Sequence, residues 1–105
     1  MIEYRNKWDN KEEIVLVRED GQGYGHINLD EPSMPKDTAF IHDLVVHPNA
    51  RSEGYGNEIL DALEVVAMAE GKKYVVLAPS KMAVEWYRRH GYVPYAVSFL
   101  RKKVC

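Results

Sequence analysis

The residues best placed to do chemistry lie in segment 45–60, where an Arg-x-x-Gly-x-Gly pattern joins an apolar strand to an amphipathic helix. Arg51, Gly54 and Gly56 form the pattern, and a proline ends the preceding strand. A loop of this kind turns several backbone N–H groups toward one point at a helix N-terminus, where the partial positive charge of the helix dipole also lies. Such sites bind anions, most often a phosphate or diphosphate. The loop is therefore predicted to bind a phosphorylated ligand.

Length and composition restrict the class of protein. The chain has 105 residues, 46% hydrophobic and 29% charged, the balance of one globular domain over residues 1–105. No apolar run approaches the roughly 20 residues that span a bilayer, and the first five residues lack the apolar core of a secretory signal. A net charge of −2 argues against nucleic acid and membranes as partners. The single cysteine, Cys105, excludes an internal disulfide and suits a reducing compartment, so we expect a cytoplasmic protein.

The N-terminal half is predicted to consist of strands. A β-branched run at 13–18 and the segment 24–29 flank turn residues and form a hairpin. A longer strand at 38–46 alternates imperfectly, which indicates either a strand covered on both faces or a β-bulge near Asp43. Residues 1–10 are too few for helices and can form a short leading strand.

The C-terminal half alternates helices and strands. Apolar spacing predicts a helix at 54–70 that ends at Gly71, and a second helix at 80–90 that its first residue can cap. A short strand is predicted at 74–78 and a last strand at 95–101. The order β-β-β-α-β-α-β predicts an α/β fold, a mixed sheet with helices on both faces and a right-handed parallel crossover. The expected inward-facing residues of the two helices are Ile59, Leu60, Leu63, Val66 and Ala67, and then Met82, Ala83, Trp86 and Tyr87.

With these elements placed, the chain resembles the GNAT superfamily of acetyl-coenzyme A dependent N-acetyltransferases. Segment 44–56 is similar to the family's Arg/Gln-x-x-Gly-x-Gly/Ala coenzyme A loop. Segment 80–92 is similar to its Asn-x-x-Ala-x-x-x-Tyr helix, which ends in a glycine–aromatic pair. Both motifs stand in the expected context, and the likeness extends over residues 13–101. The resemblance implies a GNAT-like acyl-CoA N-acyltransferase fold, acetyl-CoA as co-substrate and direct transfer of acetyl to a primary amine in a ternary complex.

The resemblance also implies which residues bind the cofactor. The edge of the strand before the loop would bind the pantetheine arm, and the loop would bind the diphosphate. Arg51 either pairs with a phosphate or braces the loop. Ser80 stands where the family usually has asparagine, so it makes a shorter or water-bridged contact or only caps its helix. The implied cofactor-binding residues are Leu44, Val45, Val46, Arg51, Ser52, Glu53, Gly54, Tyr55, Gly56 and Ser80.

Tyr87 matches the family tyrosine that acts as a general acid. A phenol titrates near pH 10, so Tyr87 stays protonated at neutral pH and can donate to the departing thiolate. The alternative is a packing role beside Trp86. A backbone N–H near Leu44 would stabilise the oxyanion. For the general base the candidates are His42 and Asp43, where the alternative for His42 is a hydrogen-bonded structural role.

A second departure from the family, besides Ser80, leaves alternatives open. The chain lacks room for the two helices that wall the acceptor site in the family, so the cleft is either open or completed by a second subunit, and we expect a homodimer. A non-catalytic acyl-CoA binding module is the alternative function, and a structural domain without cofactor binding is a third. The expected acceptor is a small-molecule or peptide amine. The histidines lack metal-ligand spacing, so no metal is expected.

Overall fold

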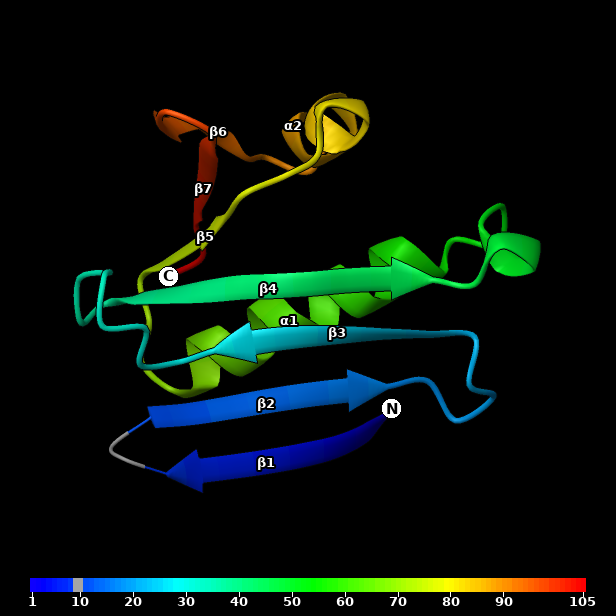
Figure 1. Cartoon of the computed structure of the whole chain (residues 1–105), viewed down its shortest axis with the longest axis horizontal. Coiled ribbons are helices and arrows are strands. Elements are labelled where there is room, and N and C mark those ends of the chain that lie inside the picture. The colour runs from blue at the N-terminus through cyan, green and yellow to red at the C-terminus, as the bar shows by residue number, and fades with distance from the viewer. Residues whose placement is uncertain (9–10) are drawn as a thin grey trace.

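The computed structural model describes residues 1–8 and 11–105, which form a seven-stranded mixed sheet in the order β1-β2-β3-β4-β5-β7-β6 with two α-helices (Figure 1). The end of the expected leading segment, residues 9–10, lies outside the described residues. The strands are β1 Ile2–Trp8, β2 Lys11–Val17, β3 Gly23–Asn28, β4 Thr38–Val46, β5 Tyr74–Leu77, β6 Val93–Ala96 and β7 Phe99–Lys103. The helices are α1 Tyr55–Ala69 and α2 Val84–Arg89, each preceded by a 3-10 turn, at Pro48–Ala50 and Lys81–Ala83.

The first four strands form an antiparallel meander, which confirms the leading strand and the hairpin predicted from the sequence. The β3–β4 register also explains the imperfect alternation of β4. Ile27 pairs with Ile41 but His26 pairs with Asp43, so His42 is the extra residue of a β-bulge. The bulge reverses the alternation beyond it, and Leu44 and Val46 consequently pack toward the core.

Helix α1 begins and ends where its glycines predict. Gly54 precedes it with a φ of 77°, a left-handed conformation that favours glycine. At the other end Gly71 has a φ of 79°, and its N–H donates to the carbonyl of Met68. The N–H of Lys72 donates to the carbonyl of Ala67, which completes a Schellman motif. The expected helix over 54–70 is therefore confirmed to within one residue at each end.

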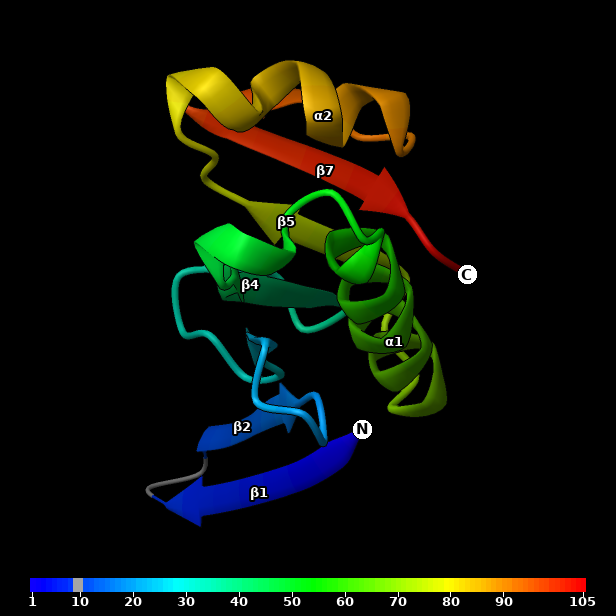
Figure 2. The ribbon, with the colours of Figure 1, turned by 90° about the vertical axis from the view of Figure 1, so that its right-hand side faces the viewer.

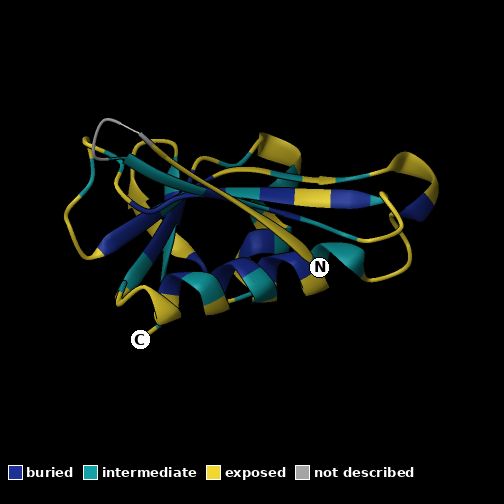
Figure 3. Ribbon diagram, turned by 90° about the horizontal axis from the view of Figure 1, so that it is seen from below, coloured by how far each residue is buried: buried dark blue, intermediate teal, exposed yellow. Residues whose placement is uncertain are grey.

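One core cluster joins the sheet to both helices. The cluster lies on one face of the sheet, because its strand residues occur in pairs two positions apart. These pairs are Ile14 and Leu16, Ala39 and Ile41, and Val75 and Leu77. Helix α1 turns its buried residues to this face (Figure 3), and α2 lies beside β7 near the end of α1 (Figure 2). The mixed α/β class is confirmed. The arrangement differs from the expectation in one respect, because Tyr87 of α2 joins the same cluster and both helices therefore share this face.

The close approach of α1 to β3 depends on Gly25. A Cβ atom at this position would lie 2.6 Å from Leu63 Cδ1 and 2.8 Å from Ile59 Cγ2, closer than real Cβ contacts. We expect Gly25→Ala to lower the free energy of unfolding by roughly 1–3 kcal/mol, because Leu63 and Ile59 must repack or carry α1 away from the sheet. Urea denaturation of the two proteins measures this difference. An unchanged midpoint would show that the helix accommodates the methyl group without loss.

The C-terminal region differs from the prediction. Instead of one strand at 95–101, β6 and β7 form a hairpin, and β7 pairs with β5. The chain turns at 97–98, where Ser98 adopts a φ of 68°. The turn lacks the Asn-Gly or Asp-Gly pair typical of tight hairpins, and its valine continues the alternation of the flanking strands. The second helix is also shorter than 80–90, since its first turn is a 3-10 turn.

Candidate active site

The candidate site begins where β4 and β5 separate. The two strands pair in parallel from Thr38 with Tyr74 to Ile41 with Leu77. Beyond Ile41, β4 continues to Val46 paired with β3, and among residues 1–8 and 11–105 no strand pairs with its other edge over 42–46. The backbone N–H and C=O groups of this edge can hydrogen-bond an extended ligand in the way that they would bond an additional strand.

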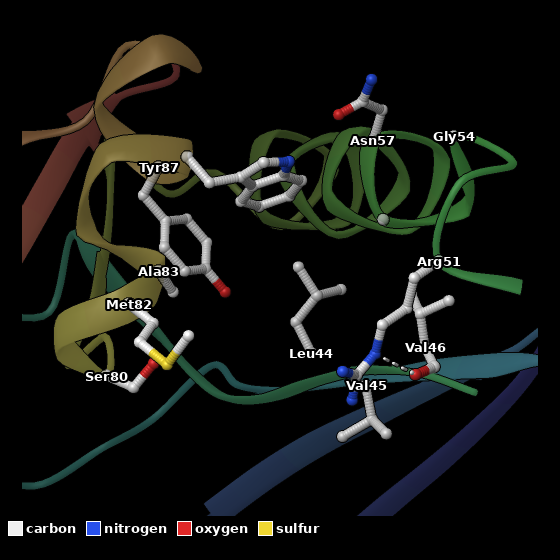
Figure 4. Close-up of a pocket in the computed structure, with 12 residues that line it drawn as sticks. Leu44, Val45, Val46, Arg51, Gly54, Asn57, Ser80, Met82, Ala83 and Tyr87 are labelled. Atoms are coloured by element: carbon white, nitrogen blue, oxygen red, sulfur yellow. Dashed lines mark hydrogen bonds between the residues drawn. The ribbon is translucent and has the colours of Figure 1, made fainter. Parts of the chain in front are cut away.

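A cleft of about 730 Å³ opens along this edge (Figure 4). Strand β4 forms one side, the loop before α1 and the first turn of α1 form another, and the segment from Ser80 to Tyr87 closes it. The lining residues are Leu44, Val45, Val46, Arg51, Gly54, Gly56, Asn57, Ser80, Met82, Ala83, Trp86 and Tyr87.

The structure brings eight of the sequence-predicted site residues to this cleft: Leu44, Val45, Val46, Arg51, Gly54, Gly56, Ser80 and Tyr87. Five others lie outside its lining. Ser52 and Glu53 are exposed in the turn before α1. The ring of Tyr55 lies under the guanidinium of Arg18, 3.5 Å from its carbon Cζ. His42 and Asp43 lie on the bulge of β4, before the lined part of the strand.

Sequence reasoning missed four lining residues, Asn57, Met82, Ala83 and Trp86, as cleft residues. Asn57 follows Gly56 directly, so the motif itself placed it at the helix N-terminus. Met82 was expected to face inward, but its side chain is 96% exposed. The 3-10 turn at Lys81–Ala83 changes the facing of these residues, and an α-helical periodicity therefore misplaces Met82.

The loop before α1 is held by Arg51 and by a close contact at Gly56. Arg51 Nε donates to the backbone carbonyl of Val46 at 3.4 Å, a bracing contact between loop and strand. A Cβ on Gly56 would lie 3.2 Å from Trp86 Cζ2, so the glycine lets the indole approach the first turn of α1. The first turn of α1, whose backbone N–H groups have no partner within the helix, therefore lines a cleft that no side chain of residue 56 obstructs.

Ser80 lines the cleft without capping the turn that follows it. Its backbone carbonyl accepts from Ala83, but its hydroxyl makes no capping hydrogen bond. The expected cap role of Ser80 is therefore wrong for the side chain. The hydroxyl remains able to bind a ligand in the cleft.

Tyr87 combines burial with access to the cleft. Its side chain is only 8% exposed and packs against Trp86 and Tyr92, with ring centroids 4.9 and 5.7 Å away. Its hydroxyl points into the cleft toward Leu44 (Figure 4). Burial raises the pKa of Tyr87 from 10 to about 12, so the phenol is a protonated donor throughout the physiological range.

The raised pKa predicts a loss of stability in alkali. Because the folded protein holds this proton more tightly than the unfolded chain, the stabilisation is complete below pH 10 and is lost as the pH rises toward about 12. The total loss is on the order of 2–3 kcal/mol from Tyr87. Burial also raises the pKa of Tyr92, which acts in the same direction. Urea denaturation at pH 9 and pH 11 should show a smaller loss for Tyr87→Phe than for the wild type, and an equal loss would contradict the burial effect.

The candidate base residues belong to a cluster of histidines and carboxylates. His42 Nε2 lies 3.6 Å from Glu31 Oε2, and its ring lies 5.1 Å from that of His26. His26 Nδ1 lies 3.8 Å from Asp43 Oδ2, and its Nε2 lies 3.2 Å from Glu13 Oε2 without hydrogen-bond geometry. His26 alternates with the core residues Gly25 and Ile27, so this cluster lies on the face opposite α1. His26 was not among the residues predicted from the sequence, because it is distant in sequence from Asp43 and reaches it only through β3–β4 pairing.

The described residues provide neither a metal site nor a membrane-spanning helix. Within residues 1–8 and 11–105, no three His, Cys, Asp or Glu side chains are grouped so that they can hold a metal ion. Over the same residues, no helix has both the length and the apolar character needed to cross a membrane.

The fold and cleft define a mixed α/β protein with a ligand site between two separating parallel strands. A model of the acetyltransferase (GNAT) family matches residues 1–92, and the chain therefore belongs to this family. The GNAT resemblance and the GNAT-like fold inferred from the sequence are thus confirmed. The family supports acyl transfer as the general activity, and it generally uses acetyl-CoA with amine acceptors.

Solved structures show the same fold. The chain is 28% identical to an acetyltransferase from Bacillus cereus ATCC 14579, with a TM-score of 0.74 over 89% of this chain and 74% of that one. It also resembles Elp3 of the archaeon Methanocaldococcus infernus, with 18% identity and a TM-score of 0.85. That match includes 97% of this chain and 29% of the Elp3 chain. Tetrahymena GCN5 is similar in fold, with 12% identity and a TM-score of 0.72 over 93% of this chain and 71% of that one. Among curated proteins, none matches the sequence.

Proposed function

We propose that this chain is an N-acetyltransferase that moves an acetyl group from acetyl-CoA to a primary amine by direct attack in a ternary complex. The observation that carries the proposal is the cleft itself. The unpaired edge of β4, the N-terminus of α1 and the hydroxyl of Tyr87 all open on one space. Residues 1–105 are proposed to act as one catalytic domain in the cytoplasm.

The proposed cofactor contacts follow the shape of the cleft. Backbone amides of 51–56 and the first turn of α1 bind the diphosphate, where the helix dipole is also favourable. The free edge of 44–46 binds the pantetheine arm through backbone groups. Ser80, on the facing wall, offers its uncapped hydroxyl to the same arm. Arg51 is proposed to shape the loop through its contact with Val46, with its remaining guanidinium nitrogens available to a phosphate.

The proposed chemistry uses residues on both sides of β4. The amine nitrogen forms a bond to the acyl carbon, and the bond between that carbon and sulfur breaks. A backbone N–H of Leu44 or Val45 stabilises the oxyanion, and Tyr87 donates a proton to the departing sulfur. His42 or Asp43, on the opposite face, accepts the proton that the ammonium loses before it attacks. The second proton leaves the nitrogen as the intermediate collapses to the amide, and its return to Tyr87 restores the phenol.

An acceptor panel tests this function. Purified protein is incubated with acetyl-CoA and with polyamines, amino sugars, amino acids and peptide N-termini, and release of free thiol is measured. The proposal expects turnover with at least one class of amine, and formation of the acetylated amine by mass spectrometry. Hydrolysis of acetyl-CoA at the same rate without any amine would contradict transfer.

The alternative function is a non-catalytic acyl-CoA binding module. The open face near His42 favours it, because the described helices cover only the opposite face of the sheet. Calorimetry that detects coenzyme A binding, together with an acceptor panel that detects no transfer, would support this alternative. Absence of binding would instead indicate a structural domain without a cofactor.

A homodimer is proposed from the same open face. The register aligns Ile2, Val17, Tyr24 and Val45 in one row across β1 to β4, and Ile2, Tyr24 and Val45 are exposed. Tyr4 is exposed in the next row. Burying this apolar row against a second copy removes it from water. Sedimentation at micromolar concentration should give a dimer, whereas a monomer would contradict the proposal.

A further inference from the structure

His90 lies between the two helices that wall the cleft. It follows α2 directly, and its ring nitrogens face oxygen atoms from both helices. Nδ1 is 2.6 Å from the backbone carbonyl oxygen of Trp86, and Nε2 is 2.6 Å from Asn57 Oδ1. Trp86 belongs to α2, and Asn57 belongs to the first turn of α1. One imidazole ring therefore bridges the two walls.

The bridge is satisfied in both forms of the ring. The carbonyl of Trp86 can only accept, so Nδ1 of His90 carries a hydrogen and donates it. The amide of Asn57 accepts through its oxygen from a charged ring, and it donates through its nitrogen to a neutral one. Both hydrogen bonds can thus persist when His90 changes its protonation state.

The same ring also supports the indole that contacts the anion-binding turn. The rings of His90 and Trp86 have centroids 4.2 Å apart, at an interplanar angle of 37°. Trp86 in turn packs close to Gly56, since a Cβ added to that glycine would lie 3.2 Å from Trp86 Cζ2. The Asn57 amide points away from Leu44 (Figure 4). Its hydrogen bond with His90 therefore joins the two helices at the margin of the cleft and not beside Leu44.

We propose that His90 is a positioning residue that sets the width of the cleft. It fixes α2, which carries Tyr87, against the first turn of α1. This inference rests on the proposed function, because a bound cofactor must place its diphosphate at α1 while its sulfur reaches Tyr87. A fixed distance between the two helices lets both contacts form at once.

The first test is His90→Leu, which replaces the imidazole with an apolar side chain of similar size and removes both hydrogen bonds. We expect the Kd for coenzyme A to rise about tenfold by calorimetry, the effect of losing one or two hydrogen bonds of ordinary strength. The titration is made well below the melting temperature, where the variant is folded, so a merely structural role would leave the Kd unchanged. Arg89→Leu, at the neighbouring exposed position, is the control and should bind as the wild type does.

A double-mutant cycle with Asn57→Ala identifies the bridge. If His90 acts through Asn57, the double variant should bind coenzyme A about as weakly as either single variant. Additive effects on the Kd would overturn the inference, since Asn57 would then act independently of His90. The same cycle is measured by urea denaturation without cofactor, where the two substitutions should again be coupled. Additive losses of stability there would also overturn the bridge.

These outcomes separate the inference from the proposed function. Wild-type protein that binds no coenzyme A would overturn both, although the denaturation cycle would still report the contact between His90 and Asn57. Wild-type binding with an unchanged Kd in His90→Leu would overturn the positioning role alone. Tight wild-type binding, weak binding by His90→Leu and coupling in both cycles would support it.

Discussion

Tyr87→Phe is expected to lower kcat by roughly one to three orders of magnitude while leaving the Kd for coenzyme A nearly unchanged. The substitution removes one hydroxyl that points into the cleft and retains the ring that packs against Trp86 and Tyr92. Without this donor the sulfur must leave as an unprotonated thiolate. The measurement is steady-state turnover with a reactive amine, combined with calorimetry for the cofactor.

Tyr92→Phe is the matched control for this experiment. This substitution also removes a buried phenol hydroxyl, which donates to Glu64 at 2.9 Å. Tyr92 is not among the residues that line the cleft. We expect Tyr92→Phe to lower stability and to leave kcat near the wild-type value. If Tyr87→Phe turned over at the wild-type rate, Tyr87 would have only a packing role, and another group would have to protonate the sulfur.

The second large effect is expected at Gly56, where a β-branched side chain should weaken coenzyme A binding by about 10- to 100-fold. A Cβ at this position already lies 3.2 Å from Trp86 Cζ2 and 3.9 Å from Val46 Cγ2. The two further methyl groups of Gly56→Val would displace the indole or fill the cleft over the amides of α1. Calorimetric titration with coenzyme A measures the change in affinity.

Ala69→Val provides the control for Gly56→Val, because it adds bulk of the same kind at an exposed position in the last turn of α1. Both variants introduce a β-branched residue into one helix, so a difference in affinity between them reports the cleft. Equal and undiminished affinity in both would show that the cofactor does not approach the first turn of α1.

The parts of the fold that depend on local signals were predictable from the sequence. Helix α1 has an apolar stripe and a glycine at each end, and its predicted limits hold within one residue. Strand β4 was predicted at its observed bounds, with the bulge as one of two explanations. The β6–β7 hairpin was not predicted, because Ser98 adopts its positive φ without a glycine or asparagine that would signal it.

The residues of the candidate site likewise divide into those that local motifs indicate and those that only tertiary packing brings together. Arg51, Gly54 and Gly56 belong to one local motif and Tyr87 to another, so the sequence indicated these residues, and the structure places all four in the cleft lining. His26 reaches Asp43 only through strand pairing, and His90 reaches Asn57 across 33 positions of sequence through the packing of two helices. Contacts of this kind follow from tertiary packing, which no local pattern of residue types encodes.

A crystal structure with bound coenzyme A is the decisive measurement for the proposed cofactor site. We expect the diphosphate on the backbone amides of 51–56 and the first turn of α1, the pantetheine arm along 44–46 and the sulfur beside the hydroxyl of Tyr87. A nucleotide bound elsewhere on the protein, with the cleft between β4 and β5 left free, would contradict it.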